Sequence, residues 1–270
     1  MKKIILKCGV ITLCLLLTAC KIEVVVPEQG RVSSESGALD CEAGVTCVVD
    51  VVDLFFDDTF AIVPVADGVS YGEWVKKSRG LCGGSAEPCH LFTSWAEGYP
   101  AIISFIENQT EVFYLEPRFF HLQSPSFAYG DRIPTKHTCD SSDYSPEIRW
   151  SGVPNKAMSL ALIVDDPDAP TILPWVHWVV YNMPSSLAGL PERSTAINYP
   201  EEALSGMNDF GSNGYGGPCP PSGTHRYVFK LYALDSVLPD LLNPTKADLV
   251  EAMEGHIIAE TVLIGTYSYP

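Results

Sequence analysis

Basic residues are scarce in this sequence. Its 270 residues include 17 Lys and Arg against 33 Asp and Glu, which gives a formal net charge of −16 at pH 7. Proteins that bind the nucleic-acid backbone neutralise phosphates with Lys and Arg, so the composition argues against that class. Charged residues make up 19% of the chain and apolar residues 46%. A chain with this balance can bury a sizeable core and is too apolar to be disordered.

Apolar runs long enough to span a bilayer are missing as well. The nearest, residues 4–17, is interrupted by Lys7 and is shorter than the ~20 residues that a membrane-spanning helix needs. It follows Met1-Lys2-Lys3 and ends at Leu17-Thr18-Ala19-Cys20. A positive start, a short apolar region and small residues at its end are typical of a secretory signal peptide. The sequence therefore predicts an exported protein with a signal peptide over residues 1–19.

Small residues just before a Cys resemble the bacterial lipobox, where the Cys receives a diacylglycerol and becomes the first mature residue. The resemblance implies lipidation of Cys20 and anchoring through acyl chains such as palmitate, because two or more chains give a stable membrane anchor. Lys21, in place of Asp, implies sorting to the outer membrane of a Gram-negative bacterium, on its periplasmic or surface side. The alternative is an ordinary secretory signal that happens to end near a Cys.

Cys-x-x-Cys pairs are absent, which makes a zinc site the weaker explanation of the cysteines. Six cysteines follow Cys20, and an even set in an exported protein indicates disulfides. Spacing favours two bridges that close short loops, and the remaining pair would close a long loop worth about 4–5 kcal/mol in the chain-entropy model. The favoured pairs are Cys41 with Cys47, Cys82 with Cys89, and Cys139 with Cys219.

Composition divides the rest of the chain into three parts. Residues 20–38 are polar and contain Ser and Gly, which predicts a lipidated tether; a first strand followed by a turn is the alternative. Residues 39–118 hold short β-rich runs between turn residues, with no sustained helical period. Part of this segment, residues 57–84, resembles small bacterial surface modules of the internalin B-repeat kind. We expect a small β-rich, disulfide-stapled domain that serves as a spacer.

Longer apolar runs follow residue 119, over residues 159–164, 175–182 and 227–234. Runs of this length between Pro/Gly clusters are typical of a β-sandwich rather than of alternating βαβ units. One helix is expected near the end of the chain. Its signature is a capping pair, Thr245 and Asp248, followed by an apolar stripe of Leu249, Met253 and Ile257. The expected fold of residues 119–270 is all-β with a C-terminal helix.

Two carboxylates, Asp166 and Asp168, directly follow the first of these runs. Pro167 favours an extended conformation for Asp166, and residues two apart in an extended segment point the same way. The two side chains are therefore expected to face one site. A capped turn, with the carboxylates accepting backbone N–H groups, is the alternative.

Two histidines complete a candidate binding site. His177 lies inside an apolar run, where a lone His is more often a core residue. The Gly/Pro-rich segment 214–223 then leads straight into a strand that begins near His225. In that strand His225 and Tyr227 would share one face. Glycine N–H groups can form an anion-binding nest, so the donors suit a phosphate while a carboxylate accepts from an ammonium.

These segments together resemble the phosphatidylethanolamine-binding protein family, and its bacterial Raf-kinase-inhibitor-like branch in particular. The resemblance covers residues 119–270 and implies a two-sheet antiparallel β-sandwich with a small pocket for phosphate or other anionic head groups. The motifs are Asp166-Pro167-Asp168-Ala169-Pro170, Trp175-Val176-His177-Trp178, Gly214-Tyr215-Gly216-Gly217-Pro218 and His225-Arg226-Tyr227. The candidate ligand-binding residues are Asp166, Pro167, Asp168, His177, Gly217, Pro218, His225 and Tyr227.

The expected function is that of an anchored exported lipoprotein that binds a phospholipid head group or a small phosphorylated ligand. The first alternative is an inhibitor or scaffold of a partner protein such as a protease or kinase. The second is a metal-dependent hydrolase, since a mixed carboxylate and imidazole set suits zinc or iron. Neither Gly-x-Ser-x-Gly nor His-Glu-x-x-His is present, so named hydrolase mechanisms lack support. We expect no enzymatic activity and no cofactor.

Overall fold

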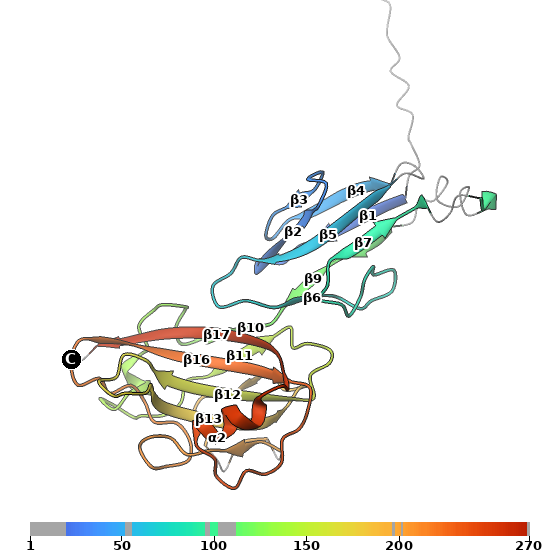
Figure 1. Ribbon diagram of the computed structural model, residues 1–270. Helices are drawn as coiled ribbons and strands as arrows, with labels where there is room; N and C mark the ends of the chain where they lie inside the picture. The colour runs from blue at the N-terminus through green and yellow to red at the C-terminus, as the bar shows by residue number, and fades with distance from the viewer. Residues whose placement is uncertain are drawn as a thin grey trace, which may run out of the picture.

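The fold is given by a computed structural model in which a small β-module precedes a larger β-sandwich (Figure 1). The predicted signal peptide, residues 1–19, and the side chain of Cys20 lie outside the described residues. No helix within the described part of the chain is long and apolar enough to cross a bilayer. The residues described are 20–51, 56–94, 98–101, 112–195, 198–200 and 202–268.

Two sheets and a short ribbon form the N-terminal module (Figure 1). Its core contains Val24, Val32, Phe60, Trp74 and Leu115, all fully buried. One sheet has the order β4-β1-β8 and the other β3-β2-β5-β7, while β6 pairs with β9. The strands are β1 (Cys20–Val25), β2 (Gly30–Ser34), β3 (Asp40–Cys41), β4 (Thr46–Val51), β5 (Asp57–Pro64), β6 (Gly72–Trp74), β7 (Cys89–Phe92), β8 (Val112–Leu115) and β9 (Pro117–Phe119).

The prediction of a tether over residues 20–38 is wrong. Strand β1 lies in the middle of its sheet, antiparallel to β4 and parallel to β8. The alternating apolar residues Ile22, Val24 and Val26 are buried, which gives this segment the period-2 pattern of a strand. Its polar residues occupy the alternate positions and the turn, so the segment forms the first strand and turn of the module.

The three favoured disulfides are confirmed. Cys41–Cys47 and Cys82–Cys89 close short loops within the module, with Cα–Cα distances of 5.9 and 5.7 Å. Cys139–Cys219, with a Cα–Cα distance of 5.5 Å, joins two loops that are 80 residues apart in the sequence. These separations fall within the normal range for a disulfide.

An antiparallel β-sandwich follows the module, and one of its layers is a five-stranded sheet of order β15-β13-β12-β16-β17. The opposing sheet is β10-β11-β14, and a 3-10 turn, η2 (Thr135–His137), lies between β10 and β11. The strands are β10 (His121–Gln123), β11 (Ile148–Ser151), β12 (Ser159–Asp166), β13 (Trp175–Pro184), β14 (Gly189–Leu190), β15 (Leu204–Ser205), β16 (Thr224–Leu234) and β17 (Ile257–Ser268).

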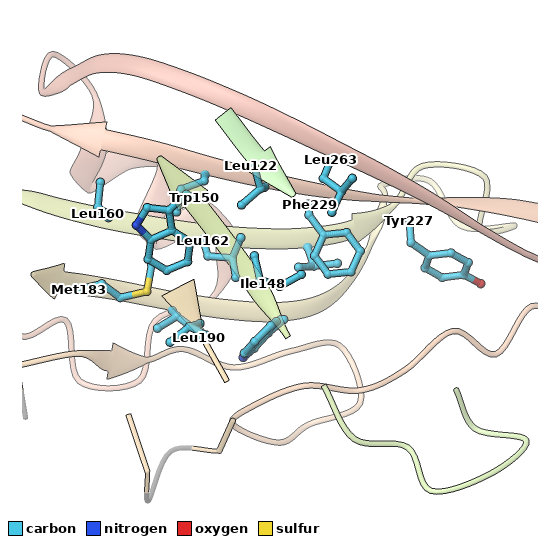
Figure 2. Close-up of a cluster of buried hydrophobic side chains, with 14 of the residues drawn as sticks. Leu122, Ile148, Trp150, Leu160, Leu162, Met183, Leu190, Tyr227, Phe229 and Leu263 are labelled. Atoms are coloured by element: carbon cyan, nitrogen blue, oxygen red, sulfur yellow. The ribbon is translucent and has the colours of Figure 1, made fainter. Parts of the chain in front are cut away.

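The core of the sandwich lies between the two sheets (Figure 2). Trp150 and Ile148 of β11 face Leu160, Leu162 and Phe229 of the larger sheet, and all five side chains are buried. The other face of the large sheet is covered by helix α2 (Lys246–Met253). Both faces of β12 are therefore buried, which explains its continuous apolar run.

Helix α2 carries the predicted cap. Thr245 accepts from the N–H of Asp248, and the Asp248 carboxylate accepts from the N–H of Thr245. Leu249 and Met253 are buried against the sheet as expected. The prediction for Ile257 is wrong, because the helix ends at Met253 and Ile257 begins β17 with 43% of its surface exposed. The helix thus precedes the last strand and does not end the chain.

Module and sandwich meet without a linker. The expected boundary after residue 118 falls inside β9, whose partner is β6 of the module. The Gly68 carbonyl accepts from Thr261 Oγ1 and from the Val262 N–H, each at 3.0 Å. Gly68 has φ +75°, and a Cβ there would lie 1.8 Å from the Val262 carbonyl oxygen, so only glycine allows this approach. Direct hydrogen bonds therefore hold the two parts together.

Candidate functional site

A pocket of about 290 Å³ opens at one end of the large sheet. Its walls come from the end of β12, the start of β13, the start of β16 and the loops beside them. The antiparallel register pairs Asp166 with Trp175, and β16 lies on the other side of β12, so these strand ends meet at one edge. The lining residues are Asp166, Ala169, Pro170, Thr171, Trp175, His177, Phe210, Cys219, Pro221 and His225.

Asp166 and His225 form the most buried polar pair of the pocket. The Nδ1 of His225 lies 2.7 Å from Oδ2 of Asp166, and both side chains are less than a tenth exposed. Because a carboxylate accepts hydrogen bonds, the pairing assigns the proton to Nδ1. The Nε2 of His225 has no hydrogen-bond partner among the described residues. The pair therefore fixes the ring and leaves one nitrogen for a ligand.

His177 is oriented in the same way by a backbone group. Its Nδ1 lies 2.6 Å from the carbonyl oxygen of Gly216, and the Gly216 N–H donates to the His177 carbonyl at 2.9 Å. The first contact assigns the Nδ1 proton, so Nε2 is again the unpaired nitrogen within the described chain. Burial lowers the pKa of His177, so its ring is neutral at neutral pH.

Asp168 does not face the pocket, so the prediction that both carboxylates share one site is wrong. The chain turns at Pro167, and the Asp168 N–H donates to Oδ1 of Asp166 at 2.8 Å. The Asp168 carboxylate binds the Arg226 guanidinium at 2.7 and 2.8 Å and accepts from the Arg226 N–H. Hydrogen bonding to Arg226 lowers the pKa of Asp168 to about 2. The capped-turn alternative is the correct one, and neither Pro167 nor Asp168 lines the pocket.

Gly217 and Pro218 do not line the pocket. They anchor the Gly/Pro loop to the segment that contains Cys139 and Asp143. The Gly217 N–H donates to Oδ1 of Asp143 at 2.7 Å, so it is not available as an anion donor. A Cβ on Gly217 would lie 2.5 Å from the His137 carbonyl oxygen, which explains the glycine. The Pro218 carbonyl accepts from the N–H of Cys139 at 3.1 Å. Together with the Cys139–Cys219 bridge, these contacts fix the position of the loop.

Tyr227 supports the pocket from its inner side. His225 and Tyr227 are buried on one face of β16 and Arg226 is exposed on the other, which confirms the predicted register. The Tyr227 ring meets His177 edge to face, with ring centroids 5.1 Å apart. Its Oη lies near the Cys219 backbone but makes no well-formed hydrogen bond within the described residues. Burial raises the pKa of Tyr227, so it remains a neutral phenol.

Two aromatic residues, Trp175 and Phe210, line the pocket but are not among the predicted site residues. Phe210 packs edge to face on both Trp175 and His177, at centroid distances of 5.5 and 5.4 Å. Trp175 is the first residue of the Trp175–Trp178 motif that contains His177, so its place in the pocket wall was predictable from the sequence. Phe210 comes from a polar Gly/Ser segment with no strand or motif signal, and only the folded chain places it here.

The metal-binding alternative would use the carboxylates of Asp166 and Asp168 with the imidazoles of His177 and His225. Asp168 does not join this set, because its carboxylate binds the Arg226 guanidinium. Within the described ranges, no group of three or more His, Cys, Asp or Glu side chains is arranged to hold a metal ion. The arrangement suits a small polar ligand enclosed by aromatic and proline walls.

A small pocket with two oriented imidazoles at the end of an antiparallel sandwich defines a ligand-binding domain. The comparisons agree: the sequence model described as phosphatidylethanolamine-binding protein matches residues 123–268. The chain belongs to the phosphatidylethanolamine-binding protein family. A UPF0098 protein of Methanothermobacter thermautotrophicus is 50% identical over 148 residues, which cover 54% of this chain and 97% of that protein. A UPF0098 protein of Chlamydia pneumoniae is 47% identical over 150 residues, with the same coverage.

Solved structures show the same domain. A phosphatidylethanolamine-binding protein homologue from Chlamydia trachomatis is 44% identical, with a TM-score of 0.52 over 56% of this chain and 98% of that one. Escherichia coli YbcL, described as a member of the mammalian family, is 34% identical, with a TM-score of 0.54 over 56% of this chain and 99% of that one. These matches cover about half of the chain, so the internalin-like character of the module stays a prediction.

Proposed function

We propose that the pocket binds the phosphorylated head group of a phospholipid or a similarly small anionic ligand. The observation that carries this proposal is the pair of imidazoles, His177 and His225, each held through Nδ1 and each with Nε2 unpaired among the described residues. A phosphate oxygen can accept from both rings once they carry a proton at Nε2. The protonated ring of His225 would then lie between the Asp166 carboxylate and the phosphate, so neither negative charge is left without a positive partner.

The walls suit the other end of such a ligand. Trp175 and Phe210 present aromatic surface beside the imidazoles. An ammonium group over an aromatic ring gains about 0.5–2 kcal/mol, depending on how far it is removed from water. A zwitterion such as phosphoethanolamine would therefore place its phosphate at the histidines and its ammonium against the aromatic wall. A volume near 290 Å³ is at the lower limit of the ~300–1,000 Å³ typical of ligand pockets, which fits a head group alone.

Head-group affinity should fall as the pH rises, and this tests the proposal. Burial lowers the pKa of His177, so its ring is neutral at neutral pH without a ligand, and binding of an anion must be accompanied by uptake of a proton from solution onto the ring. Above the imidazole pKa, a rise of one pH unit should lower the affinity about tenfold for each proton that is taken up on binding. The measurement is calorimetric titration with glycerophosphoethanolamine between pH 5.5 and 8, in buffers of different ionisation enthalpy.

The choice of ligand supplies the control. A phosphodiester keeps a single negative charge over this range, whereas a phosphomonoester titrates near pH ~6 and would confuse the result. Uptake of protons on binding near pH 7 is expected. Affinity that is independent of pH, with no proton uptake, would mean that the imidazoles do not hold the phosphate.

We further propose that the protein is exported and anchored through a lipid on Cys20. Three disulfides in the described chain support an oxidising compartment, and the N-terminal sequence supports lipid attachment. Cells fed an alkyne fatty acid should label the wild-type protein, and the label should remain with the membrane fraction. The Cys20→Ser variant should lose the label. A Cys20→Ser variant that is labelled as strongly as the wild type would rule out this anchor.

A further inference from the structure

A second cavity, of about 400 Å³, shares the Gly/Pro loop with the head-group pocket but none of its lining residues. Gly214 and Tyr215 of the loop line this cavity, whereas Cys219, further along the same loop, lines the pocket. The other walls come from the segments 142–145 and 193–195 and from Asn213. The volume falls within the ~300–1,000 Å³ typical of small-molecule sites. We refer to this space as the Arg193 cavity.

The charged residues among those that line the Arg193 cavity are one cation and one anion, Arg193 and Asp143. Within the described chain these two form no ion pair, and the Arg193 guanidinium has no hydrogen-bond acceptor. The neighbouring carboxylate, Glu192, pairs with Lys136 at 2.6 Å instead. Asp143 accepts from the Gly217 N–H through Oδ1 at 2.7 Å, which leaves Oδ2 without a hydrogen bond among the described residues. The cavity thus offers a guanidinium and a carboxylate oxygen to one ligand.

Both charged residues have an uncommon backbone conformation. Arg193 has φ +65° and Asp143 has φ +53°, in the left-handed region that favours glycine. The Arg193 N–H donates to the Ser145 carbonyl at 3.1 Å, and the Ser194 N–H donates to the Ser145 hydroxyl at 2.8 Å, which holds this turn in place. Residues in such conformations cluster at ligand sites, where the surrounding structure supports the strain. The conformation therefore favours a binding role for Arg193 and Asp143.

Tyr144 orients the guanidinium. The guanidinium carbon of Arg193 lies 4.4 Å from the centroid of the Tyr144 ring. A guanidinium that stacks on a ring with its face directs its N–H donors outward from its edge, where they match the two oxygens of a carboxylate. The stacking also restricts the Arg193 side chain before a ligand arrives, which lowers the entropy cost of binding.

We propose that the Arg193 cavity binds a free α-amino acid, with the carboxylate at Arg193 and the ammonium at Asp143. Site and ligand each carry one charge of either sign, so their charges are complementary. A phosphate dianion would meet a single guanidinium and the Asp143 carboxylate in the same cavity, so the charges select a carboxylate. The side chains of Ser142 and Asn213 have no hydrogen bond within the described chain and are available to other polar groups of the ligand. This site is separate from the head-group pocket and does not depend on its proposed function.

Chemical-shift titration of the isotope-labelled protein tests the site. The probes are alanine, serine, leucine and phenylalanine, followed by the amide and the N-acetyl derivative of the one that binds most tightly. Shift changes should cluster in the segments 142–145, 193–195 and 213–215 and not at His225. The amide lacks the carboxylate and the N-acetyl derivative lacks the ammonium, so each should bind about tenfold more weakly than the parent amino acid.

Three variants locate the effect. Arg193→Gln removes the cation and should weaken amino-acid binding about tenfold, while glycerophosphoethanolamine should bind as it does to the wild type. The matched control is Arg132→Gln, since Arg132 is also exposed and stacks on a tyrosine, Tyr267, at 4.6 Å, but lines neither cavity. It should keep wild-type affinity for the amino acid. Arg193→Gly supplies the residue that φ +65° favours, so thermal denaturation should show an intact fold while amino-acid binding is lost.

The inference is wrong if none of the four amino acids shifts the signals of the Arg193 cavity, or if the shift changes gather at His225. It is also wrong if Arg193→Gln binds the amino acid as tightly as the wild type, or if either derivative binds as tightly as its parent. These results leave the head-group proposal standing, because a different ligand and different residues test it. Loss of glycerophosphoethanolamine binding in Arg193→Gln would overturn the inference too, since the two cavities would then act as one site.

Discussion

Replacing Cys139 and Cys219 with Ser should lower the stability of the sandwich by about 4 kcal/mol, because the bridge closes a loop of 80 residues. For a domain of this size the melting temperature should fall by roughly 8–16 °C. Cys219 also lines the pocket, and the N–H of Cys139 donates to Pro218 in the loop. Head-group affinity should therefore fall as well. Thermal denaturation followed by circular dichroism measures the first effect and calorimetric titration the second.

The matched control for this variant is the double replacement Cys41→Ser with Cys47→Ser. That bridge spans 6 residues within the module, so the chain-entropy contribution is smaller, and no residue of the module lines the pocket. Head-group affinity should then be unchanged. An equal loss of affinity in the two variants would contradict a local role for the Cys139–Cys219 bridge in shaping the pocket.

Replacing His225 with Ala should weaken head-group binding by roughly tenfold to a hundredfold. A hydrogen bond to a charged group contributes about 1.5–3 kcal/mol, and the variant also removes the ring that would share a proton with the phosphate. The variant leaves the Asp166 carboxylate buried without its partner, so some loss of stability is expected too. Titration with glycerophosphoethanolamine at pH 6 gives the affinity, and thermal denaturation shows whether the fold is retained.

Two further variants separate binding from stability. Arg226→Gln changes the neighbouring residue of the same strand, but its side chain faces Asp168 outside the pocket, so head-group affinity should be unchanged. The double variant Asp166→Asn with His225→Ala removes the uncompensated charge and should recover part of the stability without recovering affinity. Wild-type affinity in His225→Ala would exclude this ring from the ligand site.

The sandwich was predictable because two of its central strands, β12 and β13, are buried on both faces and appear in the sequence as long apolar runs. Strand β16 alternates buried residues with half-buried or exposed ones, and its register followed from the alternation of His225, Arg226 and Tyr227. Two cysteine pairs, Cys41–Cys47 and Cys82–Cys89, were predictable because each closes a short loop, and Cys139–Cys219 was the pair that remained. The strands and the two short bridges depend on local patterns that the folded chain preserves.

The errors come from contacts between distant segments. An extended Asp166 and Asp168 were expected, but Arg226, 58 residues further on, attracts the second carboxylate and stabilises a turn. Gly217 was expected to offer its N–H to a ligand, but Asp143 takes it. Phe210 carries no local signal of a binding role. No pattern of neighbouring residues contains these partners, so the sequence predicted the strands around the pocket better than its lining.

Strand β1 has a consequence for the proposed anchor. Cys20 pairs with Val51 at the first position of the strand, so the residue proposed to carry the lipid is itself part of a sheet. An anchored copy would then have no slack between bilayer and protein. Its height above the lipid surface and its range of tilt would be set by the dimensions of the module, and inserting a flexible spacer after Cys20 would be the way to widen that range.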